Sequence, residues 1–128
     1  MKVNGQSYRT IWFESNCLKL IYQPLLPHQF EIRTLNTSQE VIQAIREMWV
    51  RGAPAIGAAG AFGMVLTVLE STEAHYREYS KSGADLLRAT RPTAKNLFVG
   101  IDRVFHQIQK DSIYSTLSNH IILIIQLK

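Results

Sequence analysis

The run from Trp49 to Met64 constrains the fold more than any other part of this sequence. A single cation, Arg51, stands before a Gly52-Ala53-Pro54 turn, and small residues fill most of the segment that follows. A proline just inside a helix start loses no hydrogen bond, because the amide at that position would have no partner. We therefore predict a helix that begins near Pro54, with free backbone N–H groups beside Arg51 in a geometry that suits phosphate or carboxylate.

A simpler explanation of Arg51 is an ordinary corner between two helices with a solvated arginine. The same choice arises at Arg91-Pro92-Thr93, where an arginine again stands at a helix junction. Two such corners could hold one phosphate ester between two guanidinium groups. Alternatively, each arginine caps the carbonyls of the preceding helix or pairs with a carboxylate, and the residues alone favour this ordinary role.

The uncharged stretch from Ala53 to Leu69 is predicted to be a buried helix of a soluble fold. It is rich in glycine and alanine, and it is shorter than the ~20 residues that span a bilayer. Gly57, Gly60 and Gly63 recur at every third position, so they lie roughly along one stripe. Such a stripe lets another backbone approach closely, at a cost in helix propensity.

Composition narrows the classes of partner. The 128 residues are 46% hydrophobic and 19% charged, as expected of one soluble domain with a real core. The net charge of +4 mildly favours anionic ligands, but no run of Lys and Arg exists, so we expect no nucleic-acid partner. The single cysteine, Cys17, excludes an internal disulfide and a cysteine-based zinc site, and the four histidines lack ligand spacing. We therefore expect no metal ion, and we expect no membrane contact. Because no signal peptide is visible, we expect a cytoplasmic location.

Residues 1–36 are predicted to form a small antiparallel sheet. Tyr8–Phe13 is β-branched and aromatic, and Cys17–Tyr22 alternates apolar residues with others. Residues 14–16 read as the hairpin turn between these two strands. A third strand is expected over Gln29–Leu35, after two prolines that break the chain.

Residues 37–110 are predicted to be a helical bundle that forms one N-terminal domain with the sheet. Thr37 and Glu40 have the spacing of a capping box, which opens a helix over Ser38–Trp49. The last helix has an apolar stripe of residues at helical spacing. The further helices are expected over Pro54–Leu69, Ala84–Ala89 and Thr93–Lys110, and the stripe is Leu97, Ile101, Val104, Phe105 and Ile108. The fold class is therefore α+β, a small N-terminal antiparallel sheet followed by a helical bundle.

Residues 111–128 do not match the rest of the sequence. A Ser- and Asn-rich stretch leads into Ile121–Ile125, an aliphatic run without polar alternation. Such a run needs a buried strand position or promotes aggregation. We expect a domain that has been truncated, with exposed apolar surface and self-association into a homo-oligomer.

Two strings in this sequence are specific enough to compare with known families. Ile45–Gly57 contains Val-Arg-Gly-Ala-Pro-Ala-Ile-Gly, and Arg91–Phe98 reads Arg-Pro-Thr-Ala-Lys-Asn-Leu-Phe. Together with Leu25-Leu26-Pro27, they resemble the N-terminal domain of the S-methyl-5-thioribose-1-phosphate isomerase family. The similarity runs from about residue 8 to about residue 104. The same ancestry includes ribose-1,5-bisphosphate isomerase and the alpha, beta and delta regulatory subunits of the translation-initiation guanine-nucleotide exchange factor.

The resemblance implies a cofactor-free aldose-to-ketose isomerisation in methionine salvage, from S-methyl-5-thioribose 1-phosphate to S-methyl-5-thioribulose 1-phosphate. It implies that Arg51, Gly52, Ala53 and Arg91 contact the sugar-phosphate substrate, chiefly its phosphate. The family's catalytic cysteine and aspartate lie in a Rossmann-like C-terminal domain that is absent here, and Cys17 matches neither. The expectation is therefore an N-terminal isomerase fragment with no catalytic residue of its own. The alternative is a non-catalytic regulatory or interaction module of the exchange-factor type.

Overall fold

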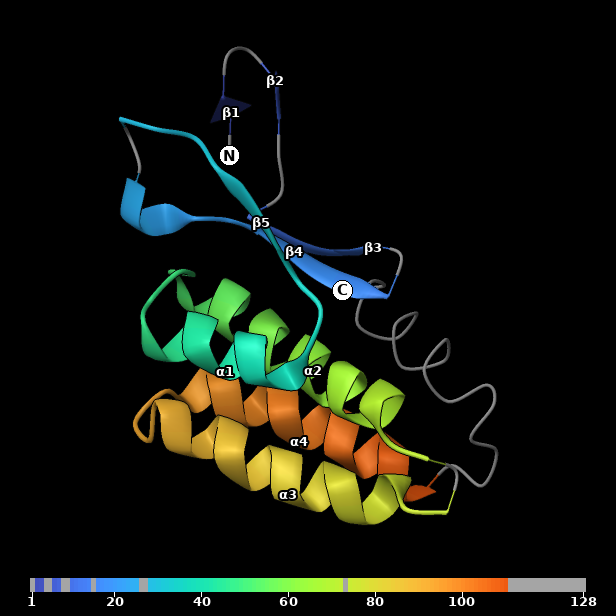
Figure 1. Cartoon of the computed structure of the whole chain (residues 1–128). Coiled ribbons are helices and arrows are strands. Elements are labelled where there is room, and N and C mark those ends of the chain that lie inside the picture. Colours follow the sequence, from blue (N-terminus) through green and yellow to red (C-terminus); the bar gives the residue numbers. More distant parts are fainter. Residues whose placement is uncertain are drawn as a thin grey trace.

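The computed structural model describes residues 2–3, 6–7, 10–14, 16–25, 28–72 and 74–110. A three-stranded antiparallel sheet of order β3-β4-β5 packs on α1 and α2, and Figure 1 shows α3 and α4 on the far side of these two helices. The predicted α+β fold, a small sheet followed by helices, is confirmed. The elements are a hairpin of β1 (Lys2–Val3) and β2 (Gln6–Ser7), then β3 (Ile11–Glu14), β4 (Cys17–Ile21), a 3-10 turn (Gln23–Leu25), β5 (Ile32–Leu35), α1 (Ser38–Arg46), α2 (Ala53–Glu70), α3 (Tyr76–Thr90) and α4 (Lys95–Lys110).

The sheet buries one face against α2. Leu18 and Leu20 on β4 are fully buried, and the residues between and before them are only half-buried. Leu18 pairs with Phe13 on one side and with Leu35 on the other. The Phe13 ring stacks on Phe62 of α2 with 5.1 Å between ring centroids. This alternation is the reason that three short strands suffice to cover the helices.

The start of α1 is capped from two directions. The Glu40 N–H donates to Thr37 Oγ1 at 3.2 Å, so the predicted capping box is present. The Glu40 carboxylate reaches one residue further back than usual and accepts from the Asn36 N–H at 3.1 Å. The second contact comes from Glu70, the last residue of α2. Its carboxylate accepts from both the N–H and the hydroxyl of Ser38, each at 2.7 Å. A carboxylate there suits the positive end of the α1 dipole.

The prediction that the first helix extends to Trp49 was wrong, because α1 ends at Arg46. Met48 has a positive φ of 61°, which a continuing helix does not allow. The chain then turns so that the Trp49 N–H donates to the Ala44 carbonyl at 2.8 Å and the indole becomes buried. Burial of this large ring under the sheet outweighs the cost of the left-handed residue.

The short helix predicted over Ala84–Ala89 is only the end of α3, which begins at Tyr76. Its buried face includes Ser80 and Gly83, which do not read as apolar in the sequence. Ser80 Oγ donates to the Arg77 carbonyl at 2.7 Å, so the hydroxyl is satisfied in the core. The bounds of three other elements also differ from the predicted ones: β3 is Ile11–Glu14, β5 is Ile32–Leu35 and α4 begins at Lys95.

Helix α2 is the core of the bundle, as predicted. It is long and apolar enough to cross a membrane by length and composition alone, yet 61% of it is buried inside the fold. A Cβ on Gly57 would lie 2.9 Å from the Asn96 carbonyl oxygen, and a Cβ on Gly100 would overlap the Gly57 carbonyl oxygen. Gly60 packs on the side chains of Leu97 and Ile101, and Gly63 packs on Leu87 of α3 and Val41 of α1. The predicted close backbone approach is therefore made by α4 at Gly57, whereas the rest of the predicted stripe accommodates side chains.

The predicted apolar stripe of α4 is also confirmed, since Leu97, Ile101, Val104 and Ile108 are buried and Phe105 is half-buried against the core. Figure 1 shows that α2 and α4 run in the same direction, since both start at the end of the bundle where the α1–α2 and α3–α4 connections lie. Helix α3, which lies between α2 and α4 in the sequence, runs in the opposite direction. The predictions for residues 111–128, including Ile121–Ile125, lie outside the described residues.

Candidate anion-binding site

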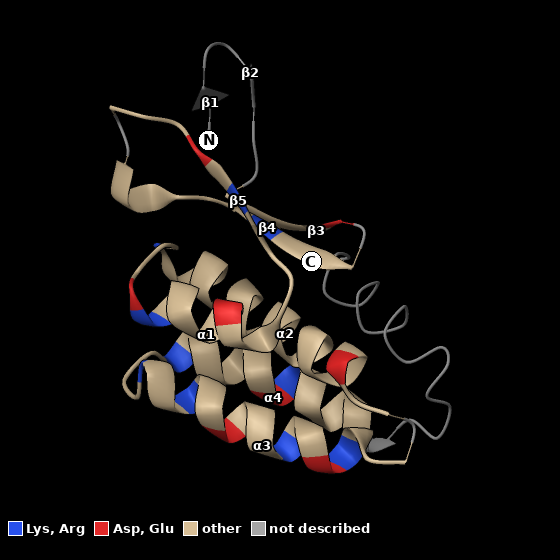
Figure 2. Cartoon of the chain, viewed as in Figure 1, with Lys and Arg blue, Asp and Glu red and all other residues tan. Residues whose placement is uncertain are grey.

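The two arginine-containing turns predicted from the sequence lie at the same end of the helical bundle. Figure 1 shows that the α1–α2 connection and the α3–α4 connection both lie there, and Figure 2 shows Lys or Arg in each. Since α2 and α4 are parallel and in contact near their starts, their N-termini point the same way. Helix N-termini carry unpaired N–H groups and a partial positive charge. This end of the molecule therefore combines two helix starts with two arginines.

The Arg51 turn is built around an unusual glycine. Gly52 is the N-cap of α2, with φ 89° and ψ 137°, and its carbonyl accepts from the Ile56 N–H at 3.0 Å. A side chain rarely adopts such a φ, and nothing lies within 4 Å of the place that a Cβ would occupy. Arg51 and Ala53 are exposed, and Pro54 stands in the first turn as predicted. The open space in front of Gly52 leaves room for a ligand at the backbone.

The Arg91 turn is held by bonds between neighbours in the sequence. Arg91 is the C-cap of α3, is half-buried, and accepts through its carbonyl from the Ala94 N–H at 3.0 Å. The preceding Thr90 Oγ1 donates to the Leu87 carbonyl at 2.6 Å. The end of α3 is thus closed by a threonine hydroxyl.

Neither Arg51 nor Arg91 makes an ion pair with any carboxylate among the described residues. Arg88, one turn before Arg91, differs: it contacts Asp85 at 3.5 Å and also pairs with Asp102. One ordinary role weighed from the sequence, pairing with a carboxylate, is therefore seen for Arg88 and not for the two arginines of the turns. The exposed Arg51 also fits the simpler explanation, a solvated arginine at a corner between two helices.

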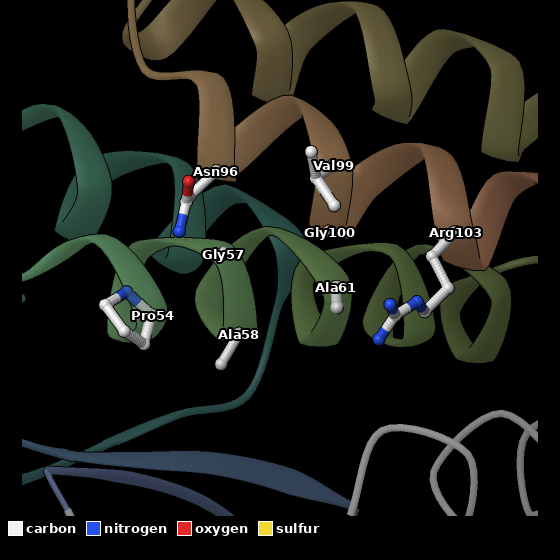
Figure 3. A pocket seen from close by; sticks show the side chains of 8 residues that line it. All are labelled: Pro54, Gly57, Ala58, Ala61, Asn96, Val99, Gly100 and Arg103. Atoms are coloured by element: carbon white, nitrogen blue, oxygen red, sulfur yellow. The ribbon is translucent and has the colours of Figure 1, made fainter. Parts of the chain in front are cut away.

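A hollow of ≈ 380 Å³ lies along the seam between α2 and α4, next to the Arg51 turn in sequence. Figure 3 shows Pro54 and Asn96 at one end of it and Arg103 at the other, with Ala58 and Ala61 between them. Neither Arg51 nor Arg91 lines it. Its lining residues are Pro54, Gly57, Ala58, Ala61, Asn96, Val99, Gly100 and Arg103.

Our sequence reasoning did not identify this hollow. The signal that could have found it is the spacing of Asn96 and Arg103, which are two helical turns apart and therefore share a face of α4. Gly100 lies on that face between them, opposite the stripe of small residues on α2. A contact between two helices that is lined by glycines, with a polar residue at each end, therefore indicates a hollow that side chains do not fill.

No cluster of three or more His, Cys, Asp or Glu side chains that could hold a metal ion occurs among the residues placed in the structure. Cys17 is half-buried, and its thiol donates to Asn36 Oδ1 at 2.8 Å. Cys17 lies at the start of β4. In the bond described for it, the thiol contacts an amide oxygen and no cationic group that would activate it as a nucleophile.

No protein-family model matches this chain. Among curated proteins, it is similar to methylthioribose-1-phosphate isomerases. The protein from Paramagnetospirillum magneticum is 42% identical over 108 residues, which are 81% of this chain and 28% of that protein. The protein from Desulfatibacillum aliphaticivorans is 46% identical over 101 residues, 76% of this chain and 27% of that protein. Isomerase 2 of Pseudothermotoga lettingae is 48% identical over 100 residues, 77% of this chain and 29% of that protein.

Two solved structures share the fold with equal TM-scores of 0.85. One is subunit delta of the translation initiation factor eIF-2B from A. fulgidus, with 38% identity over 93% of this chain and 35% of that one. The other is 5-methylthioribose 1-phosphate isomerase from Pyrococcus horikoshii OT3, with 31% identity and the same coverage. The chain thus spans about a third or less of the length of the proteins that it matches.

Proposed function

Since this chain belongs, as a counterpart of the N-terminal region, to the family of the methylthioribose-1-phosphate isomerases and the eIF-2B alpha, beta and delta subunits, we propose that it is the substrate-binding part of such an isomerase. The reaction proposed is conversion of S-methyl-5-thioribose 1-phosphate to S-methyl-5-thioribulose 1-phosphate in methionine salvage, in the cytoplasm. The part assigned to the described residues is to bind the phosphate ester of this sugar.

The observation that carries the proposal is that two cationic turns lie at the same end of the bundle, beside the starts of two parallel helices. An arginine fork binds phosphate oxygens through two parallel hydrogen bonds, which fixes the orientation of the ester as well as its position. Arg51 and Arg91 both lack an ion pair with a described carboxylate. The helix starts add backbone N–H donors directed at the same anion.

Each of the four residues has a separate role in this proposal. Arg51 and Arg91 supply the two guanidinium groups. The N–H groups of Gly52 and Ala53 donate to the phosphate, and the open space beside Gly52 lets the ester reach the backbone. The sugar then extends from the turn, with its phosphate as the fixed point.

The isomerisation itself moves a proton between two neighbouring carbons and needs an acid and a base. Among the described residues, the Cys17 thiol bonds to Asn36, and Asp85 and Asp102 both contact Arg88. These groups are therefore engaged away from the proposed phosphate site. We propose that the acid and base lie outside the described residues and that these residues alone give negligible turnover.

Binding of S-methyl-5-thioribose 1-phosphate to the 128-residue chain tests the proposal. Arg51→Ala and Arg91→Ala should each weaken binding at least about tenfold, since each removes a charged hydrogen-bond donor. Arg46→Ala is the matched control, because Arg46 is an exposed arginine in the last turn of α1 and its loss changes the net charge equally. Unchanged affinity in Arg51→Ala, or turnover by the chain equal to that of a full-length enzyme, would contradict the proposal.

A second candidate is a non-catalytic interaction module of the exchange-factor type. The solved eIF-2B subunit delta matches this chain at the same TM-score as the isomerase and at higher identity, 38% against 31%. Stable one-to-one copurification with a partner protein would support this role. Phosphate-ester binding that depends on Arg51 and Arg91 would count against it as the main role.

We also propose that the chain self-associates, because the aliphatic run Ile121–Ile125 in its sequence would be poorly tolerated in water. Sedimentation velocity over a range of concentrations measures this directly. A sharp monomer boundary at the highest concentration would rule it out.

A further inference from the structure

We propose that Arg33 is a positioning residue for the phosphate site, because it holds the Arg51 turn against the sheet. This inference rests on the proposed function and adds a residue that contributes no direct contact to the phosphate in it. Arg33 lies on β5, remote in sequence from the turn. Its effect is transmitted through two aromatic rings.

The three side chains of Tyr22, Arg33 and Trp49 form a cluster, which we call the aromatic clamp. The guanidinium carbon of Arg33 lies 3.5 Å from the centroid of the Tyr22 ring and 4.5 Å from that of Trp49. The two rings meet edge to face with 5.3 Å between centroids. One cation therefore contacts an aromatic ring of the sheet region and an aromatic ring of the turn together.

Hydrogen bonds fix both sides of the aromatic clamp. On the sheet side, Arg33 Nε donates to Glu31 Oε2 at 2.9 Å, and the Tyr22 N–H donates to the Glu31 carbonyl at 2.8 Å. On the turn side, Trp49 Nε1 donates to Glu47 Oε1 at 3.2 Å. The Trp49 carbonyl accepts from the Gln23 N–H at 3.1 Å, which ties the turn to the segment after β4.

The backbone of the turn needs such external support. Met48 has a positive φ of 61°, which is strained for a residue with a side chain, whereas the φ of 89° at Gly52 costs a glycine little. Strained conformations persist only where surrounding contacts over-determine them. Trp49 is only 9% exposed and lies two residues before Arg51, so we expect a shift of its indole to move the backbone that carries Arg51 and the Gly52 amide.

Arginine suits this position better than lysine would. Its flat guanidinium stacks on ring faces, whereas a lysine ammonium is a compact and strongly hydrated point charge. Arg33 is about one-third exposed, so the aromatic clamp lies at the protein surface. It therefore places a positive charge close to the turn. The conservative change Arg33→Lys therefore keeps the charge and removes the flat contact.

The test uses two variants and one control in the 128-residue chain. Arg33→Lys retains the charge, and Arg33→Met retains the length of the stem without charge. The control is Arg77→Lys, since Arg77 lies over the Tyr76 ring at 5.2 Å at the start of α3, away from the turn. The readouts are affinity for S-methyl-5-thioribose 1-phosphate, the thermal midpoint, and amide hydrogen exchange over residues 47–53.

We expect Arg33→Met to weaken binding about tenfold and Arg33→Lys about threefold, because lysine restores charge without the stacked geometry. Exchange should rise in residues 47–53 and stay unchanged in α3 and α4. Arg77→Lys should alter neither affinity nor exchange in the turn. A contact that only stabilises the fold would instead lower the thermal midpoint and raise exchange throughout the chain.

Arg33→Met with wild-type affinity and wild-type exchange in residues 47–53 would overturn the inference, as would an increase in exchange spread evenly over the chain. Failure of the proposed function looks different. In that case the wild-type chain does not bind the phosphate ester at all, and the exchange measurement alone decides whether Arg33 holds the turn.

Discussion

The Arg51 turn and the Arg91 turn reach the same end of the bundle by different means. The Arg51 turn contains two residues at positive φ and is held by side chains from the sheet, chiefly Arg33. The Arg91 turn has no positive φ and is closed by bonds within its own helix ends, such as that of Thr90 to Leu87. The first turn therefore depends on tertiary contacts, while the second depends mainly on local sequence.

This difference predicts how each turn responds to change. A substitution in the sheet should disturb the Arg51 turn and leave the Arg91 turn in place. A substitution at the contact of α2 with α4 should disturb both, because that contact sets the distance between the two helix starts. Substitutions within the Arg91 turn should act on that turn alone.

Gly100→Ala should have the largest effect and should damage both turns at once. Its new Cβ would overlap the Gly57 carbonyl oxygen, which is backbone and cannot rotate away. We expect a loss of about 3 kcal/mol in the free energy of unfolding, with weakened phosphate-ester binding. Urea unfolding and a binding titration measure the two effects.

Val99→Ala is the control for Gly100→Ala, since Val99 is 60% exposed on the same helix. Its free energy of unfolding should change by less than about 0.5 kcal/mol. If Gly100→Ala proved as stable as wild type, the two helices would not be in backbone contact, and the argument for a fixed spacing of the turns would fail.

Gly52→Ala should have an intermediate effect, confined to the Arg51 turn. Its Cβ meets no neighbour, so the whole penalty comes from the backbone conformation, φ 89° with ψ 137°, which costs an alanine roughly 1–3 kcal/mol. Thr93→Ala is the counterpart in the Arg91 turn, where Thr93 is exposed and φ is not positive, and it should change stability by less than about 0.5 kcal/mol. Thermal unfolding compares the two, and equal penalties would mean that the turns do not differ as described.

The smallest effect is expected from Glu14→Gln, which removes an ion pair of the sheet and touches neither turn. Lys19 lies 2.9 Å from the Glu14 carboxylate, and its hydrogen bond and positive charge lower the pKa of that carboxyl group. A lowered pKa in the folded state stabilises the fold above the carboxyl's ordinary pKa, and this stabilisation is lost as the pH falls through the folded-state value. Because Glu14 is exposed, the effect is small.

The measurement is the thermal midpoint of wild type and Glu14→Gln at about pH 7 and about pH 2, on either side of the carboxyl titration. The small advantage of wild type at the higher pH should vanish at the lower one, with phosphate-ester binding equal in the two proteins at neutral pH. A loss of phosphate binding in Glu14→Gln would show that the sheet acts on the turn through more than the aromatic clamp.

Local signals in the sequence predicted the parts of the fold that neighbours in the chain determine. Thr37 and Glu40 marked the start of α1, and the spacing of Leu97 and Ile101 marked the buried face of α4. The glycines at every third position of α2 predicted a close contact with another helix. The sequence reasoning did not identify the partner in that contact, although Gly100 between Asn96 and Arg103 marks one face of α4 as a candidate.

The misses have a common physical cause, which is contact between residues far apart in the chain. The end of α1 at Arg46, before the positive φ of Met48, follows from the burial of Trp49 under the sheet. The early start of α3 was hidden because Ser80 and Gly83, which do not read as apolar, face the core, where Gly83 lies against Thr67 of α2. For the site, sequence alone selected both arginine turns, but their meeting depends on α2 and α4 being parallel, and the role of Arg33 depends on two rings from different regions.

The glycine contact between α2 and α4 sets limits on how this end of the molecule can adapt. Where side chains separate two helices, a change of rotamer or of residue size can shift their spacing by fractions of an ångström. Gly57 and Gly100 leave no such adjustable layer, because main chain lies against main chain. The separation of the two helix starts is thus a constant of the backbone, and a ligand of different size can be accommodated only by residues of the turns themselves.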